Sequence, residues 1–287
     1  MRGTSDDGVS RRNFLKGSAA GLAVTAVAGL GALPAGGAAG KRIPVALQLY
    51  SVRDACKADF EGTIAKVAEM GYEGVEFAGY YGKTAEDLKR ILDANGLKCA
   101  GSHVRPPELE PKNLAKTIEF HKTLGNTFLI KPSGAGGKTK QSWLDAAKRF
   151  NDIAEQLAPH GLYTGYHNHW VEFKPLDGSC AWDIFFSNTS DRVCHQLDTG
   201  NCMKGGGDPV AFLKKYPGRT RTIHLKEHGG PGDVGKGECP WKEIFQLCET
   251  VAGTEWYIVE QENYKQRKPI EAAKQAADFM KQMGKLA

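Results

Sequence analysis

The stretch from Thr220 to Glu262 shows the unit from which the fold is predicted. It begins with TRTIHLK (residues 220–226), continues through WKEIFQLCETV (residues 241–251) and ends with WYIVEQE (residues 256–262). The first and last pieces are short, apolar and rich in β-branched or aromatic residues, which is typical of buried strands. The middle piece repeats its apolar residues at helical spacing. A strand, a helix and a second strand in this order predict two parallel strands.

The same alternation runs through the chain from Pro44 onward. The other predicted strands are Val45–Ser51, Gly74–Gly79, Lys98–Val104, Thr127–Pro132, Tyr163–His169 and Val193–Asp198. The other predicted helices are Phe60–Met70, Ala85–Asn95, Leu114–Leu124, Trp143–Leu157, Pro209–Tyr216 and Ile270–Met283, with a weak one at Ala181–Asn188. No GxGxxG motif follows the first strand, which disfavours a doubly wound nucleotide-binding sheet. We therefore predict an α/β fold, a single (β/α)8 TIM barrel over residues 41–287.

The first forty residues do not share this pattern. Ser10–Lys16 carries the pair Arg11 and Arg12, and residues 17–40 are free of charge and rich in Ala and Gly. This arrangement resembles a twin-arginine export signal. Residues 1–40 are predicted to be this signal with a short linker, so the protein is expected in the periplasm or otherwise exported, with the twin-arginine translocase as its partner during export. An uncleaved membrane anchor is the alternative, although Gly and Ala make a weak apolar span.

Charge and cysteine content narrow the function classes. The formal net charge is +5, but four of the basic residues lie before residue 17, so the remaining domain is close to neutral. This balance does not indicate nucleic acid as a partner. The seven cysteines are scattered without CxxC pairs. We expect mostly buried free thiols and no cysteine metal site.

Polar residues gather where the predicted strands end. Residues two apart on a strand share a face, and the active site of a parallel barrel lies at the carboxyl ends of its strands. The polar residues at these ends are Gln48, Tyr50, Glu76, His103, Lys131, His167, His169, Gln196, Asp198, His224, Lys226, Glu260 and Glu262. Each has a structural explanation when taken alone. Burying so many ionisable groups is costly unless they are paired or bind a metal, so together they predict a functional site.

Five short motifs at these positions carry a family resemblance. They are Gly74-Val-Glu-Phe77, Tyr166-His-Asn-His169 with Glu172-Phe173, Leu197-Asp-Thr-Gly-Asn201, His224-Leu-Lys-Glu227 and Val259-Glu-Gln-Glu262. With them the sequence resembles the xylose isomerase-like barrel family, often described as sugar phosphate isomerases/epimerases, over about residues 44–283. The resemblance implies one divalent metal ion with the ligands His167, Asp198, His224 and Glu260.

The ligand types and one departure from the family shape the functional hypothesis. Two histidines with an Asp and a Glu suit Mn²⁺, Zn²⁺, Co²⁺ or Fe²⁺ better than Mg²⁺. Many relatives place a glutamate, which also acts as a base, where this chain has His167. We therefore expect Glu260 or His169 to remove a proton beside a carbonyl, giving an enediolate stabilised by the cation and Lys226. Reprotonation would isomerise or epimerise the substrate, and loss of a β-substituent would make the enzyme a lyase.

The predicted substrate is a free sugar, a glycoside or a keto-sugar, because exported sugars are seldom phosphorylated. The glycine run at residues 205–207 is accordingly interpreted as a flexible loop rather than a phosphate site. The residues expected to contact the substrate are Gln48, Glu76, His103, Lys131, Trp170, Glu172 and Glu262. Among them, Trp170 is the candidate for stacking on a sugar ring, and Glu172 for gripping a hydroxyl.

Three alternatives stay open at this point. One is a 3-keto-glycoside lyase or hydrolase of the same barrel family. Another is a metal-dependent hydrolase related to barrel endonucleases, and the third is a non-catalytic exported sugar-binding protein. The sequence leaves the sugar, the native metal and the existence of a homo-oligomer undetermined.

Overall fold

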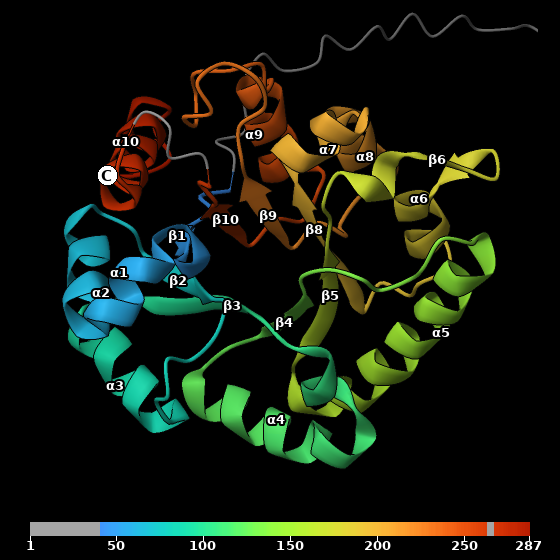
Figure 1. Cartoon of the computed structure of the whole chain (residues 1–287), viewed down its shortest axis with the longest axis horizontal. Coiled ribbons are helices and arrows are strands. Elements are labelled where there is room, and N and C mark those ends of the chain that lie inside the picture. Colours follow the sequence, from blue (N-terminus) through green and yellow to red (C-terminus); the bar gives the residue numbers. More distant parts are fainter. Residues whose placement is uncertain (1–40, 263–266) are drawn as a thin grey trace, which may run out of the picture. The chain divides into compact units, whose positions relative to one another are not determined.

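A computed structural model describes residues 41–262 and 267–287 of the chain. In this part, eight parallel strands close into a barrel in the order β1-β10-β9-β8-β5-β4-β3-β2, and helices surround them (Figure 1). The strands are β1 (Val45–Gln48), β2 (Gly74–Phe77), β3 (Lys98–His103), β4 (Phe128–Lys131), β5 (Tyr163–His167), β8 (Val193–Asp198), β9 (Thr222–Leu225) and β10 (Trp256–Val259). The predicted (β/α)8 TIM barrel is thereby confirmed.

Every predicted helix is present, with ends that shift by a few residues. The helices are α1 (Arg53–Ala58), α2 (Phe60–Glu69), α3 (Ala85–Ala94), α4 (Pro111–Leu124), α5 (Lys140–Leu157), α6 (Ala181–Phe186), α7 (Thr199–Gly205), α8 (Pro209–Lys215), α9 (Trp241–Thr250) and α10 (Pro269–Gln282). Single 3-10 turns lie at η1 (Leu49–Val52), η2 (Pro106–Leu109), η3 (Ala158–His160) and η4 (Val171–Phe173), and β6 (Pro175–Leu176) pairs with β7 (Ser179–Cys180). Several helices begin at a side-chain cap; the Asp208 carboxylate, for example, accepts the Val210 and Ala211 N–H groups.

The segment after β8 differs from the prediction. Helix α7 was not expected there, and it begins where the Asp198 carboxylate accepts the Asn201 N–H at 2.7 Å. The glycine run closes this helix instead of forming a flexible loop, because Gly206 has a φ of +89° at its end. A Cβ placed on Gly205 would lie 2.3 Å from the carbonyl oxygen of Trp170. Glycine is thus needed for the close packing of α7 against the turn after β5.

Apolar side chains fill the amino-terminal end of the barrel. Two small clusters occupy its interior: Ala46, Ala100 and Ile258 form one, and Phe128, Ile130 and Cys194 form the other. Leu197 and Leu225 belong instead to the large outer core between strands and helices. Because of this alternation, most inward-facing positions at the carboxyl ends are polar. Below them, the interior of the barrel is filled with apolar side chains.

All seven cysteines are free thiols, and six of them are buried. Burial raises the pKa of the Cys56 thiol to about 11 and that of Cys194 to about 12. Neutral buried thiols of this kind are poor nucleophiles and poor metal ligands.

Residues 1–40, on which the export signal was predicted, lie outside the described residues, so that prediction and its boundary are not tested by the fold. None of the helices in the described ranges combines the length and the apolar character that a bilayer span requires.

The buried imidazole of His121 on α4 gives a stability prediction. Burial lowers its pKa to about 4, whereas a histidine in the unfolded chain titrates near 6.5. The unfolded state therefore binds the proton more tightly, and stability is complete above pH 6.5 and is lost as the pH falls toward 4. Urea unfolding should show a loss of about 3 kcal/mol from this residue over that range. His121→Gln should flatten the pH dependence by this amount, and equal pH dependence in the two proteins would contradict the assignment.

Candidate metal centre

Four buried side chains converge at the carboxyl ends of four neighbouring strands. One donor atom of each lies within 4.8 Å of the donor atoms of the other three. The strands are β5, β8, β9 and β10, which are adjacent in the barrel. We call this set the metal quartet: His167, Asp198, His224 and Glu260. The structure thus gathers the four residues that the sequence predicts as ligands.

Two atoms of the metal quartet lack any hydrogen-bond partner among the described residues. They are His167 Nδ1 and Asp198 Oδ2, both buried. His167 Nε2 lies 4.0 Å from Asp198 Oδ2, too far for a hydrogen bond. An unpaired buried polar atom costs about 1–3 kcal/mol, so two of them together point to a missing partner. A divalent cation between these side chains would give Asp198 Oδ2 a partner, and imidazole nitrogen with carboxylate oxygen is a donor set for Zn²⁺, Co²⁺ or Mn²⁺.

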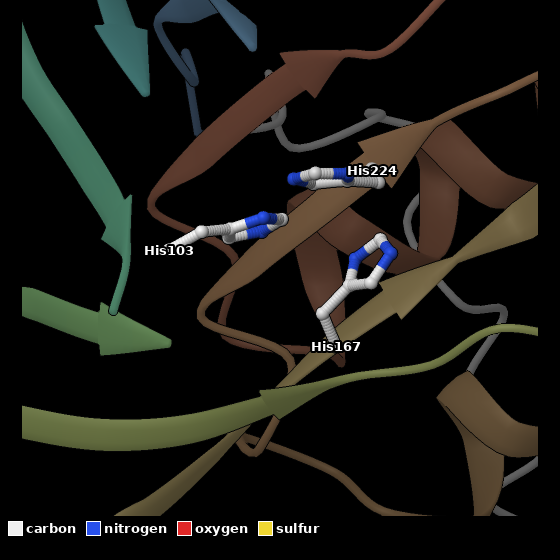
Figure 2. A group of neighbouring side chains, drawn as sticks. All are labelled: His103, His167 and His224. Carbon is white, nitrogen blue, oxygen red and sulfur yellow. The ribbon is translucent and has the colours of Figure 1, made fainter. Parts of the chain in front are cut away.

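The two histidines of the metal quartet (Figure 2) differ in charge state, and only His167 is neutral before a cation binds. Burial and the neighbouring His224 lower the pKa of His167 well below its usual value, so its imidazole is neutral and keeps a lone pair. Burial alone would also lower the pKa of His224. The charge of Glu76 and the hydrogen bond of Glu260 outweigh burial and raise it to about 10.

His224 lies between two carboxylates. Its Nδ1 is 3.0 Å from Glu260 Oε2, and its Nε2 is 2.6 Å from Glu76 Oε2. Two donors that each lie about 2.1 Å from one ion are separated by about 3 Å, so His224 Nδ1 and Glu260 fit two ligands of one cation. Glu76 then holds the opposite nitrogen, as the carboxylates behind metal-binding histidines commonly do.

Glu76 is the shared hydrogen-bond acceptor beneath the metal quartet. Its carboxylate accepts hydrogen bonds from Gln48 Nε2 and Gln196 Nε2, each at 2.6 Å, in addition to the one from His224. Glu76 and Gln48 were predicted to contact substrate. Both side chains are fully buried, so the structure places them behind the ligands, where they orient His224.

The remaining carboxylates of the site differ in their ionisation. Burial raises the pKa of Asp198, which Lys226 only partly offsets. Burial would likewise raise the pKa of Glu260, but Lys226 and His224 hold it well below its usual value. Burial opposes the charge of Lys226, yet its carboxylate neighbours raise its pKa. The ammonium nitrogen lies 3.6 Å from Glu260 Oε2 and 3.9 Å from Asp198 Oδ2, and it pairs with Glu262.

Two cavities open beside the metal quartet and share Glu260 and Glu262. One, of about 300 Å³, is lined by Tyr50, Ala78, His103, Val104, Arg105, Pro132, Ser133, His167, His169, Glu260 and Glu262. The other, of about 470 Å³, is lined by Gly200, Asn201, Lys204, Lys226, Glu227, His228, Gly229, Gly230, Gly232, Glu260, Gln261 and Glu262. The predicted site residues His103, His169, Lys226 and Glu262 therefore all face space that a substrate could fill.

Lys131 does not join them. Phe128 and Ile130 of β4 point into the barrel, so Lys131, one position further, points outward. It lines a separate cavity between α4 and α5 with Leu109 and Arg149. The structure thus separates Lys131 from the metal quartet that it was expected to accompany.

Glu172 and Trp170 lie in the turn after β5. Both carboxylate oxygens of Glu172 are occupied, one by the Tyr166 hydroxyl at 2.6 Å and the other by the His169 N–H at 2.9 Å. Glu172 is buried and holds the backbone of His169, an arrangement that differs from the predicted grip on a substrate hydroxyl. Trp170 is 40% exposed, with the ammonium groups of Lys174 and Lys204 within 6 Å of its ring centre.

Sequence reasoning overlooked Asn168. Its side chain accepts the Asp198 N–H at 2.9 Å and donates to the Asp198 carbonyl at 3.1 Å. It thereby fixes the end of β8 against the end of β5. The only signal in the sequence was a polar residue between two histidines, where the corresponding positions near the ends of β8 and β9 carry Leu197 and Leu225.

Comparison with known proteins agrees with this fold. The sequence model of the family described as "Xylose isomerase-like TIM barrel" matches residues 64–283. The chain is 23% identical over 269 residues to the rhizopine catabolism protein MocC of Rhizobium meliloti, covering 79% of this chain and 82% of that protein. It is 23% identical over 267 residues to an inosose dehydratase of Clostridium tetani, and the match covers 78% of this chain and 89% of that protein. A crystal structure of a sugar phosphate isomerase/epimerase from Parabacteroides distasonis is similar, with 25% sequence identity and a TM-score of 0.76. The match covers 87% of this chain and 97% of that protein.

Proposed function

The chain belongs to the xylose isomerase-like TIM barrel family, and we propose that it is a metal-dependent sugar isomerase or epimerase. Its reaction moves a proton next to a carbonyl group of a free sugar or keto-sugar. The observation that carries the proposal is the metal quartet, in which two buried polar atoms have no hydrogen-bond partner among the described residues. When bound there, a divalent cation supplies Lewis acidity toward a substrate carbonyl.

His169 is the base that the geometry favours. Its side chain is exposed in the cavity beside the metal quartet, and it makes no hydrogen bond to another described side chain. An imidazole can take and return a proton near neutral pH. Glu260 is the alternative, but its ion pair with Lys226 and its contact with His224 make it a weaker base.

Lys226 supplies a positive charge near Glu260, in the cavity that does not contain His169. Its ammonium group lies in the second cavity within reach of the carboxylates of the site. There it can stabilise the negative oxygen that develops when a proton leaves the neighbouring carbon. Glu262 pairs with Lys226 and fixes its direction.

A lyase reaction is the second candidate. The similarity to inosose dehydratases favours it, because loss of water from a keto-sugar or keto-cyclitol begins with the same proton removal. A phosphorylated substrate is less favoured by the site. The glycine run that might have bound a phosphate is packed against Trp170 and Phe173, where a Cβ on Gly205 or Gly207 would have no room.

Deuterium exchange tests the proposed function. The protein is loaded with Mn²⁺, Zn²⁺ or Co²⁺ and incubated in D₂O with a panel of ketoses, keto-glycosides and inososes. We expect deuterium at the carbon next to the carbonyl of one substrate class, loss of exchange after chelation, and recovery when the cation is returned. His169→Ala should keep the cation and lose exchange. A loaded protein that binds one of these sugars in calorimetry but exchanges no deuterium would instead be a sugar-binding protein.

Residues 1–40 carry a separate proposal of export through the twin-arginine route. The support is the sequence around Arg11 and Arg12. This route carries folded proteins, so the barrel would leave the cytoplasm with its cation already bound.

A further inference from the structure

Lys131, which was expected in the active site, lines a cavity outside the barrel. We call this space of about 340 Å³ the outer cavity. Its walls come from η2, the start of α4, the end of β4 and α5. Most of the lining side chains are apolar, among them Leu109, Phe150 and Ile153. A cavity of this volume and lining suits a small organic ligand.

Two basic side chains line the outer cavity without a carboxylate to neutralise them. Burial and the nearby charge of Arg149 both lower the pKa of the partly buried Lys131. Arg149 Nη2 donates to the Ala135 carbonyl at 3.2 Å, which ties the guanidinium group to the segment after β4. In residues 41–262 and 267–287, neither basic side chain forms an ion pair. Two like charges beside an apolar wall are unfavourable unless an anion accompanies them.

The two carboxylates that also line the outer cavity do not supply this anion. Glu110 and Asp152 are both exposed. Glu110 Oε2 lies 3.1 Å from Lys112 Nζ, so its charge is already paired. Exposed carboxylates that form no ion pair with Lys131 or Arg149 are screened by water and offset little of their charge.

We propose that the outer cavity binds a small organic carboxylate with an apolar body, of which phenylacetate is the simplest probe. The carboxylate accepts charge-assisted hydrogen bonds from Lys131 and Arg149, and a guanidinium group can hold both of its oxygens. The apolar body packs against Leu109, Phe150 and Ile153, where it removes apolar surface from water. This site is separate from the metal quartet and does not depend on the proposed function.

The outer cavity adjoins the cavity beside the metal quartet. Arg105 and Pro132 line the inner of these two spaces, whereas their chain neighbours Pro106 and Lys131 line the outer one. A carboxylate could therefore also bind in the inner space, with Arg105 as its partner. Arg105→Gln distinguishes the two locations, because it leaves both basic side chains of the outer cavity in place.

The test titrates full-length protein, stripped of cations by a chelator, with phenylacetate in a calorimeter. We expect one site per chain with a Kd of about 1 mM or below. Phenylacetamide has the same shape without the charge and should bind at least about tenfold more weakly. Lys131→Met and Arg149→Gln should each weaken phenylacetate binding at least about tenfold. Lys148→Gln is the matched control and should change it less than about twofold, because Lys148 is exposed on α5 outside the cavity lining.

Four outcomes would overturn the proposal. They are no phenylacetate binding by the wild-type protein, equal binding of phenylacetamide, equal binding of inorganic phosphate, and a loss of binding in Arg105→Gln but not in Lys131→Met. The third would show that the apolar wall contributes nothing, and the last would place the anion beside the metal quartet. No cation or sugar is present, so deuterium exchange tests the proposed function separately. Thermal unfolding verifies the fold of each variant, and Arg149→Gln, at an exposed position, completes the test if Lys131→Met does not fold.

Discussion

Asp198→Ala is expected to yield a folded protein that contains no cation and shows no turnover. The Asp198 carboxylate is fully buried, and its Oδ2 atom accepts no hydrogen bond from a described residue, with Lys226 Nζ 3.9 Å away. The substitution removes one of the four proposed ligands. Without the bound cation, the reaction also lacks its Lewis acid. We expect cation affinity to fall at least about a thousandfold and deuterium exchange to fall about ten-thousandfold, since metal catalysis contributes several kcal/mol. Elemental analysis and exchange into substrate measure the two effects.

The matched control for Asp198→Ala is Asp208→Ala. Asp198 also caps α7, and Asp208 caps α8 in the same way but lies outside the metal quartet. Both variants should lose about 1 kcal/mol of stability, and only Asp198→Ala should lose the cation. Wild-type exchange by an Asp198→Ala protein that holds no cation would rule out the proposed mechanism.

Glu76→Ala is expected to have the largest effect on stability. The variant leaves Gln48, Gln196 and the buried His224 without their common acceptor. Breaking a buried network of this kind costs about 3–5 kcal/mol. Urea unfolding in the presence of a chelator measures the loss without a contribution from the cation.

Asp278→Ala serves as the comparison for Glu76→Ala. Asp278 forms an exposed pair with Lys274 four residues away on α10, and its loss should cost less than about 0.5 kcal/mol. A similar small loss for Glu76→Ala would mean that the carboxylate beneath the metal quartet does not hold the site together.

The barrel and the polar residues at its strand ends could be predicted because the last strands carry a simple pattern, whereas the choice of the four ligands came from the family resemblance. In β8 and β9 an apolar residue, Leu197 or Leu225, separates two polar ones that face inward. A period of two and the rule that parallel strands end at one edge then bring Asp198 and His224 together. The family resemblance pointed to the same residues.

Lys131 shows where this reasoning fails. Strand β4 is apolar until its last residue, so no alternating pair marks which face is inward. An error of one residue moves a side chain from the barrel interior to the helices. The register with β5, in which Lys131 pairs with the outward-facing Tyr166, agrees with the position that the interior cluster of Phe128 and Ile130 gives it.

Glu172 and α7 depend on tertiary contacts that residue spacing in the sequence does not reveal. The partner of Glu172 is the Tyr166 hydroxyl, and nothing in the spacing of the two residues reveals their contact. Helix α7 contains glycines that disfavour a helix, and it is stabilised by the Asp198 cap and by packing against η4.

Anomalous X-ray scattering from crystals grown with Zn²⁺ or Co²⁺ tests the central claim most directly. We predict one peak per chain, at coordination distance (about 2.0–2.2 Å) from donor atoms of the metal quartet. Crystals of an active, cation-loaded protein with no peak among His167, Asp198, His224 and Glu260 would contradict it.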